Sequence, residues 1–490
     1  MPVLLLLPLV LIPLLAAGIC LALGPRAGTS RVTIAALTLT LVVAVMVAAQ
    51  VVNLGDQQAG GGWLHADGLS ALLVCIIAGI ALPCAAYGVD YMRHVKTLDH
   101  ADARWLPGRY EALTLGLVAC MMLSAIADNL GLLWIAVEGS TLTSALLVGY
   151  YRRPEAVEAG WKYLILCSVG ISLALFATVL VFYSGAAVFG EQGSTLRWTT
   201  LRDVASQLDP RFVKLAFLFA LIGYGTKAGL APMHSWLPDA YSQAPAPAAA
   251  LLSTALLATS LAALLRFHAI AVAGVGPEWS GALLTGFGVL SIVVAAPLML
   301  VQDEYKRLLA YSSLEHTGLV ALAVGLGTPL ALFAGLLHLL VQSLVKALAF
   351  LVGGSLQRAS GSRRMGHFSG LIEADPRLAT LLVFAGLGLV GLPPMGTFAS
   401  EWMTLAGGFA SRRAGATIVA LVALTLVFTA ITHRFSRIIL GKARERFADP
   451  LPARTRVPLV ALAGAAIVLG VWLPTPVRAL IEHAMLSIRR

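Results

Sequence analysis

The chain has 490 residues, of which 59% are hydrophobic and only 12% are charged, and its mean hydropathy is +0.86. A soluble globular fold cannot bury so many apolar side chains. The formal net charge of +10 would suit a nucleic-acid-binding protein, but in a membrane protein Lys and Arg gather in the cytoplasmic loops. We therefore expect an all-α, polytopic membrane protein that binds no nucleic acid.

Apolar stretches recur along the whole chain, and each transmembrane helix needs about 20 such residues. They predict fourteen helices, at residues 3–23, 32–53, 67–92, 111–127, 129–150, 162–184, 212–241, 246–273, 280–301, 307–326, 329–355, 377–410, 415–440 and 457–475. If the N-terminus lies outside, the inward loops carry roughly twice as many Lys and Arg as the outward loops. This predicts that both termini lie on the periplasmic side of the cell's inner membrane.

The seventh and twelfth predicted helices are interrupted by glycine and proline, so we expect both to be broken. Their interruptions are related in sequence, GLAPM at 229–233 and GLPPM at 391–395. Paired broken helices in corresponding halves indicate inverted repeats with a transport site between them. The predicted units are residues 111–273 (helices 4–8) and 280–440 (helices 9–13). Residues 1–110 would hold helices 1–3, and residues 457–490 would hold helix 14 and a C-terminal tail.

Lys227 stands in the first broken segment, where a charged residue costs roughly 2.5 to 3.5 kcal/mol on insertion scales. Its alternative role is that of a lysine whose amine reaches the membrane surface. Glu138, in the middle of the fifth helix, is the predicted partner. Burial disfavours the ammonium ion and a nearby carboxylate favours it, so a lysine between these two influences can load and release a proton. A carboxylic acid that is merely packed is the alternative for Glu138.

A polar stripe is predicted in the eleventh helix, because His338, Gln342 and Lys346 occur at i, i+4 and i+8. Such a stripe is typical of a water-lined path, although Lys346 also fits a positive anchor near a helix end. His316 is a second candidate proton relay, or a packing residue, since histidine titrates near neutral pH.

Three further residues accompany the breaks. Glu401 follows the second break and is a candidate for the far end of a relay running through Glu138, Lys227, His338 and Lys346; its alternative is an acid favoured by a helix N-terminus. His234 and Asp239 follow the first break, and we expect them mainly to cap and brace the broken helix.

Cofactor motifs are missing from the sequence. There is no H-E-x-x-H, no Walker motif and no G-x-G-x-x-G after a strand, and the five cysteines occur singly in predicted helices. We expect no metal, no cofactor and no redox site in this chain.

Residues 225–247, GTKAGLAPMHSWLPDAYSQAPAP, resemble a motif of the antiporter-like membrane subunits of respiratory complex I, Mrp cation/proton antiporters and group 4 nickel–iron hydrogenases. WKYLIL at 161–166 lies before this motif and KRLLAYSSLEH at 306–316 lies after it, which is the expected order. The amino-acid sequence of the motif is most like that of the hydrogenase-4 component F subunits. The resemblance implies a fourteen-helix proton-conducting subunit, driven by electron transfer in a peripheral arm of partner subunits.

By this resemblance, Glu138 is the helix-5 acid, Lys227 the helix-7 lysine, and Glu401 the helix-12 terminus, with His338 and Lys346 on the central axis. Four positions depart from the family pattern: Ala258 where many relatives have a lysine, Val341 and Gln342 in place of Asn or Thr and then His, and Tyr241 for a common His. Two alternatives stay open: a Mrp-type sodium or potassium/proton antiporter, and a structural anchor with an inactive channel, which Ala258 and Gln342 favour.

Overall fold

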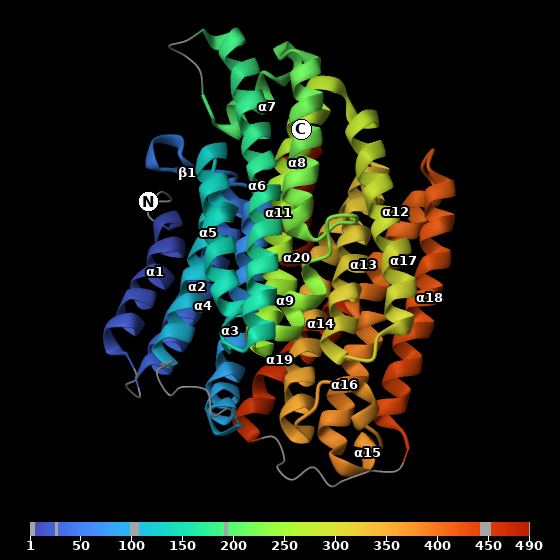
Figure 1. The fold of residues 1–490 in the computed structure, drawn as a ribbon. Coiled ribbons are helices and arrows are strands. Elements are labelled where there is room, and N and C mark those ends of the chain that lie inside the picture. The colour runs from blue at the N-terminus through green and yellow to red at the C-terminus, as the bar shows by residue number, and fades with distance from the viewer. Residues whose placement is uncertain (1–4, 25–27, 99–106, 191–194, 442–451, 490) are drawn as a thin grey trace.

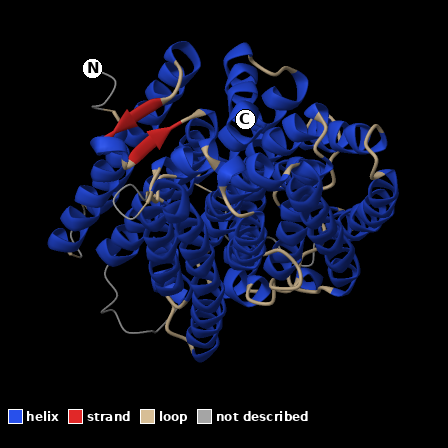
Figure 2. Cartoon of the chain, turned by 90° about the horizontal axis from the view of Figure 1, so that it is seen from above, coloured by secondary structure: helices blue, strands red, loops and turns tan. Residues whose placement is uncertain are grey.

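A computed structural model gives the fold and describes residues 5–24, 28–98, 107–190, 195–441 and 452–489. The described chain is almost entirely helical, and its helices stand side by side in one bundle (Figure 1). Seen from above, the bundle has a small two-stranded hairpin at one edge (Figure 2). The all-α prediction is confirmed.

The elements follow in chain order. Up to the first break they are α1 (Leu6–Leu23), α2 (Thr29–Leu54), β1 (Gln57–Ala59), β2 (Leu64–Ala66), α3 (Gly68–Leu98), α4 (Pro107–Ile126), α5 (Leu130–Val148), α6 (Pro154–Phe189), α7 (Trp198–Asp203) and α8 (Pro210–Ala228). Up to the second break they are α9 (Leu237–Gln243), α10 (Ala246–Leu251), a π-helical turn (Leu252–Leu256), α11 (Leu257–Val275), α12 (Pro277–Val301), α13 (Tyr305–Leu326), α14 (Pro329–Ser360), α15 (Leu371–Ala374) and α16 (Pro376–Leu389). The last are α17 (Gly396–Phe409), α18 (Ala414–Ile439), α19 (Ala453–Val471) and α20 (Thr475–Arg489).

Both breaks lie where the sequence predicts them. Helix α8 ends because Gly229 adopts a left-handed conformation (φ 77°), and the chain becomes helical again at Leu237. Helix α16 ends just before Gly391, which also has a positive φ of 61°, and α17 begins at Gly396. An X–Pro bond in each break is cis. Glycine is the residue that adopts these dihedrals without steric cost. The local sequence therefore ends each helix at its glycine.

Local sequence also explains where many helices begin. Proline occupies the first turn of α6, α8, α12, α14 and α16, where its missing N–H is not needed. Asn129 accepts hydrogen bonds from the Gly131 and Leu132 amides at the start of α5. Thr328 does the same for the Ala331 amide at the start of α14.

Twelve of the described helices are long and apolar enough to cross a membrane, and the two broken segments are not among them. The total of fourteen spans therefore stays a prediction. The tail predicted after the last span contains a further, amphipathic helix that the sequence analysis does not predict, α20 at residues 475–489. It buries Leu480, Ile481 and Ala484 and packs against α3. The charges on its other face, which lower its mean hydropathy, hide it from a search for spans.

The interior of the bundle lies around α10, α11 and α13. The most apolar windows of residues Ala246–Val275 and Tyr305–Leu326 are entirely covered by other helices, whereas only a third of the windows in α1 and α18 is covered. Polar side chains on the covered helices are therefore shielded from lipid by protein. This is where the candidate site residues gather.

Candidate proton-transfer site

Lys227 is fully buried at the end of α8, one residue before the last of the helix. Its Nζ donates a hydrogen bond to Thr141 Oγ1 on α5 at 2.9 Å and another to the Tyr163 hydroxyl on α6. The same ammonium lies 4.8 Å from the centroid of the Tyr163 ring. An amine so enclosed does not reach the membrane surface, which argues against the snorkelling alternative.

Glu138 lies on α5, three residues before Thr141, and is therefore on the same face of the helix. Its Oε1 accepts a hydrogen bond of 2.8 Å from Ser168 of α6. Its buried Oε2 has no hydrogen-bond partner among the described residues. Glu138 and Lys227 form no ion pair within 4.0 Å in the described part of the chain. Hydroxyl groups hold the lysine instead, so the predicted direct charge pair stays a prediction.

A chain of hydroxyls leads away from Lys227. The Tyr163 hydroxyl lies 2.7 Å from Ser144 Oγ, and the Tyr163 ring packs against Trp236, with ring centroids 4.7 Å apart. Trp236 in turn donates its indole N–H to the Thr226 carbonyl at 2.8 Å. Tyr163 and Thr141 are missed by an analysis that follows only charged residues in spans. The sequence indicates these two residues only weakly, because they are hydroxyl side chains at covered positions of otherwise apolar helices.

Asp239 lies in α9, just after the first break, and connects it to two neighbouring helices. It accepts a hydrogen bond of 3.0 Å from Arg307 of α13 and lies 3.6 Å from the Lys162 amine of α6. His234 is half-buried between the break and α9, and its Nδ1 has no partner among the described residues. The bracing expected of Asp239 agrees with this geometry, whereas the role of His234 stays a prediction.

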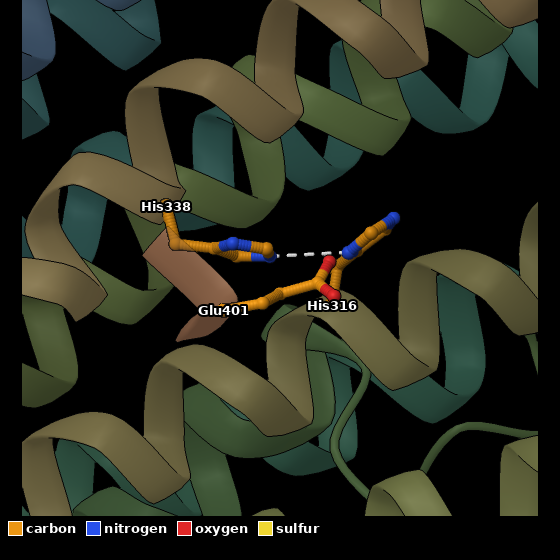
Figure 3. Close-up of side chains that lie close together, drawn as sticks. All are labelled: His316, His338 and Glu401. Carbon is orange, nitrogen blue, oxygen red and sulfur yellow. Dashed lines mark hydrogen bonds between the residues drawn. The ribbon is translucent and has the colours of Figure 1, made fainter. Parts of the chain in front are cut away.

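Three predicted residues come together near the second break, from three different helices (Figure 3). His338 of α14 lies with Nε2 3.1 Å from His316 Nδ1 of α13, and with Nδ1 2.8 Å from Ser400 Oγ of α17. A carboxylate oxygen of Glu401 and one nitrogen of each histidine all lie within 4.8 Å of one another. Both imidazoles are fully buried, and Glu401 is half-buried. The packing alternative for His316 does not account for its contact with a second titratable group.

Glu315 is a site residue that the sequence reasoning missed. It is fully buried, its Oε2 lies 3.4 Å from His316 Nδ1, and the same oxygen has no hydrogen-bond partner in the described part of the chain. Lys306 is a second one, because it is buried and donates to the Ala244 carbonyl at 2.9 Å. Both residues could have been found from the KRLLAYSSLEH segment at 306–316. Besides its tyrosine, this segment has four titratable side chains, and it lies in α13, whose most apolar window is covered by other helices.

Lys346 is also completely buried and points from α14 to α13. Its Nζ donates to the Leu309 carbonyl at 2.9 Å and to Ser313 Oγ at 3.0 Å. This excludes the surface-anchor alternative for the side chain as the structure places it. Gln342 lies between Lys346 and His338 on the covered face, and its amide donates only a long hydrogen bond of 3.4 Å to Ser343 Oγ. The predicted stripe is thus present, with a non-titratable group at its centre.

The site residues thus form a first cluster (Glu138, Thr141, Tyr163 and Lys227) and a second cluster (Glu315, His316, His338, Lys346 and Glu401). The interior between these two clusters has few proton carriers. Residues 246–265 contain no acidic, basic or histidine side chain, and Ala258 is fully buried there. The hydroxyls of this stretch donate to carbonyls of their own helix. Tyr241 donates to the Leu252 carbonyl at 3.2 Å. Direct side-chain transfer between the clusters would therefore need water along this segment.

The profile of the family described as NADH:quinone oxidoreductase/Mrp antiporter, transmembrane, matches residues 127–429, more than half of the chain. A hydrogenase-4 component F homolog of Methylacidiphilum infernorum is 36% identical over 433 residues, which are 88% of this chain and 89% of that protein. An NADH-quinone oxidoreductase subunit N of Desulforudis audaxviator is 28% identical and is covered over 84% of its length by 86% of this chain.

Solved structures show the same fold. A chain of an archaeal membrane-bound sulfane sulfur reductase superposes with a TM-score of 0.86 at 25% identity, covering 99% of this chain and 97% of that one. A chain of the Mrp complex from Dietzia sp. DQ12-45-1b superposes with a TM-score of 0.83 at 21% identity, covering 100% and 99%. These matches confirm the predicted resemblance. The chain belongs to the NADH:quinone oxidoreductase/Mrp antiporter transmembrane family, as an antiporter-like membrane subunit.

Proposed function

We propose that this chain conducts protons across the membrane as a subunit of a hydrogenase or complex I-like respiratory assembly. Its family and the names of its relatives, which include a hydrogenase-4 component and NADH-quinone oxidoreductase subunits, support this function. The sequence offers no cofactor motif, so the redox centres would belong to partner subunits in a peripheral arm. The chain itself would carry out no redox chemistry.

The observation that carries the proposal is the setting of Lys227. An ammonium ion without solvent exposure is costly, and a helix that merely spans the membrane gains nothing from it. Here the ammonium is held by two hydroxyls, with the carboxylate of Glu138 nearby but turned to Ser168. We infer two arrangements: the hydroxyl-bound lysine of the structure, and a lysine paired with Glu138. Exchange between them changes how strongly the ammonium is stabilised, so the amine takes up a proton in one arrangement and releases it in the other.

The second cluster would complete the route. Lys346 and the contact between His316 and His338 place three titratable groups on α13 and α14, and Glu401 lies beside them on α17. A proton passing between imidazole nitrogens 3.1 Å apart needs no intervening water. Gln342 and Ala258 mark the places where water would have to carry it.

Reconstitution of the parent complex in vesicles tests the proposal. We expect Lys227→Ala to abolish proton uptake, measured with a pH-sensitive dye, while electron transfer by the peripheral arm continues at a reduced rate. Lys214→Ala is the matched control, because Lys214 is exposed on the same helix. Proton uptake at the wild-type rate in Lys227→Ala would overturn the proposal.

Two other functions are distinguished by the same vesicles. A Mrp-type antiporter would exchange protons for sodium or potassium without electron transfer, and the likeness of fold to a Mrp complex chain leaves this alternative open. A structural anchor with an inactive channel would leave proton uptake unaffected by every substitution in both clusters. Ala258 and Gln342 are the residues that favour the anchor.

We also propose the predicted membrane arrangement: inverted five-helix repeats at 111–273 and 280–440, both termini on the periplasmic side, and the bacterial inner membrane as location. The matching positions of the two breaks and the distribution of Lys and Arg support it. The start of α1 and the end of α20 lie toward the end of the bundle that carries α7 (Figure 1). Accessibility of a tag after Arg490 to an external protease in intact spheroplasts tests the orientation.

A further inference from the structure

We propose that His316, His338 and Glu401 form a binding site for one divalent transition-metal ion of zinc-like chemistry, and that an ion bound there blocks proton transfer through the second cluster. The binding stands on the geometry alone, whereas the block rests on the proposed function. The three side chains come from α13, α14 and α17, so the folded bundle and not a local sequence motif assembles the site.

The donor set is one that zinc uses. Two imidazoles and one carboxylate, with a fourth position open, is a common arrangement of protein ligands around Zn²⁺. Two donors on a tetrahedral zinc with bonds of about 2.0 to 2.1 Å lie about 3.3 Å apart. His316 Nδ1 and His338 Nε2 are 3.1 Å apart, which is close to that separation, and a Glu401 oxygen lies within 4.8 Å of one nitrogen of each histidine. Because 3.1 Å is shorter than two metal–nitrogen bonds, a metal ion would lie to one side of the line between the two nitrogens, and both rings and the Glu401 carboxylate would have to rotate toward it.

The ligands are also oriented in advance. Ser400 Oγ holds His338 Nδ1 at 2.8 Å, which turns the Nε2 atom of that ring toward His316. Ser400 itself is fixed to α17, since its hydroxyl lies 2.9 Å from the Thr397 carbonyl. Such a partner on the second nitrogen of a ligating histidine fixes ring orientation and strengthens metal binding. In Figure 3 the Glu401 carboxylate points to the contact between the two rings.

Two neighbouring groups decide the charge of the site. Glu315 Oε2 lies 3.4 Å from His316 Nδ1 and has no hydrogen-bond partner in the described part of the chain, so it places a second carboxyl oxygen beside the site. Two carboxyl groups that gave up their protons in the bound ion's field would balance the charge of a divalent ion. Lys346 opposes binding, because it lies two helical turns from His338 on α14, although its amine is turned to Leu309 and Ser313.

The chemistry selects the ion. Imidazole nitrogens suit zinc, cobalt, nickel and copper, whereas Mg²⁺ and Ca²⁺ require oxygen ligands, and Ca²⁺ needs six to eight of them. Sodium and potassium ions also prefer oxygen donors. The site is therefore distinct from one that would bind the transported ion of an antiporter.

Direct metal binding tests the proposal without any transport assay. The purified full-length chain, stripped with a chelator, is titrated with Co²⁺, whose visible absorption intensifies in a tetrahedral site, and then with Zn²⁺ as competitor. We expect one Co²⁺ per chain, displaced by one Zn²⁺, and at least tenfold weaker binding in His338→Gln and in Glu401→Gln. His268→Gln is the matched control, since His268 is an equally buried histidine on α11 outside the cluster, and it should bind as the wild type does.

Ser400→Ala keeps all three ligands and serves if the other variants fail to fold, as judged by gel filtration and helical circular dichroism. Loss of the orienting hydrogen bond should weaken Co²⁺ binding about tenfold. The absence of a tetrahedral cobalt spectrum, or binding that is unchanged in His338→Gln and Ser400→Ala, would overturn the site. Zn²⁺ should also inhibit proton uptake by the wild-type complex, and Ser400→Ala should need more Zn²⁺ for the same inhibition. If Lys227→Ala transports normally, the proposed function fails, but the cobalt result still decides the site.

Discussion

The two breaks have different chemical surroundings. Beside the first break a single ammonium, Lys227, is bound by the hydroxyls of Thr141 and Tyr163, and Glu138 accepts its hydrogen bond from Ser168 instead. Beside the second break, titratable groups contact each other directly, with two histidines at 3.1 Å and two carboxylates beside them. The same interruption of a helix thus holds a hydroxyl-bound cation in one half and an imidazole–carboxylate cluster in the other. In the proposed function, the first arrangement would store one proton, and the second would pass protons between neighbouring groups.

After Lys227→Ala, the largest effect on proton uptake should follow from removing the imidazole that links the second cluster. His338 alone contacts both His316 and Ser400, and asparagine at this position can accept hydrogen bonds but cannot hold a proton. We expect His338→Asn to slow proton uptake by reconstituted vesicles about a hundredfold, the lower range for loss of a general acid–base group. His268→Asn should leave the rate unchanged. Equal rates in wild type and His338→Asn would show that protons bypass the second cluster.

A smaller effect should follow from removing one hydroxyl in the first cluster. Tyr163→Phe keeps the ring over the ammonium but removes the oxygen that contacts both Lys227 and Ser144. A water molecule or a reoriented Glu138 can replace that oxygen, so we expect proton uptake to fall several-fold and not to be abolished. Loss of a hydrogen bond to a charged group should also destabilise the protein by about 1.5 to 3 kcal/mol.

Tyr241→Phe is the matched control for this variant. Tyr241 is equally buried, and its hydroxyl bonds only the Leu252 carbonyl. A similar loss of stability in both variants, with slower transport only in Tyr163→Phe, would assign the tyrosine hydroxyl to the lysine site. Slower transport in both would mean that general packing, and not the contact with Lys227, sets the rate.

Much of this comparison follows from the sequence. The interruptions, the all-helical class and most titratable residues of both clusters, though not Glu315, can be predicted, because glycine and proline end helices by local geometry and charges in apolar spans are rare. The partners of these residues cannot be predicted from the sequence. Thr141 and Tyr163 are ordinary residues of their helices until the packing of α5 and α6 against α8 brings them to Lys227.

The partners of residues in the second cluster, and of those at the end of the bundle that carries α7, cannot be predicted from the sequence either. His316, His338 and Glu401 are spread over 85 residues of sequence, so only the crossing of three helices makes them neighbours. The buried ion pair between Asp67 and Arg266 is missed for the same reason, because it joins residues 199 positions apart. Side-chain period and composition describe one helix at a time, whereas these contacts depend on how helices pack.

The Asp67–Arg266 pair provides the variant with the smallest expected effect on transport. Arg266 of α11 donates to both oxygens of Asp67, with Nη2 2.7 Å from Oδ1, and its guanidinium lies 4.1 Å from the Trp198 ring of α7. The pair lies outside both clusters, where it ties α11 to the chain just before α3. We expect Asp67→Asn to leave the rate of proton uptake per folded complex unchanged but to lower stability by about 3 to 5 kcal/mol, since it leaves a buried cation unpaired.

The pH dependence of stability identifies the cause of that loss. Burial alone would raise the pKa of Asp67, but the Arg266 guanidinium outweighs burial and holds this pKa well below its usual range. The stabilisation is therefore complete above the pKa of the unfolded chain, about 3.9, and decreases as the pH falls below it. Thermal unfolding followed by circular dichroism should show a constant difference between wild type and Asp67→Asn from pH 7 to pH 5, and a shrinking difference below about pH 4. A difference that does not depend on pH would assign the loss to packing around Trp198, and slower transport by the folded variant would extend the proton route to this end of the bundle.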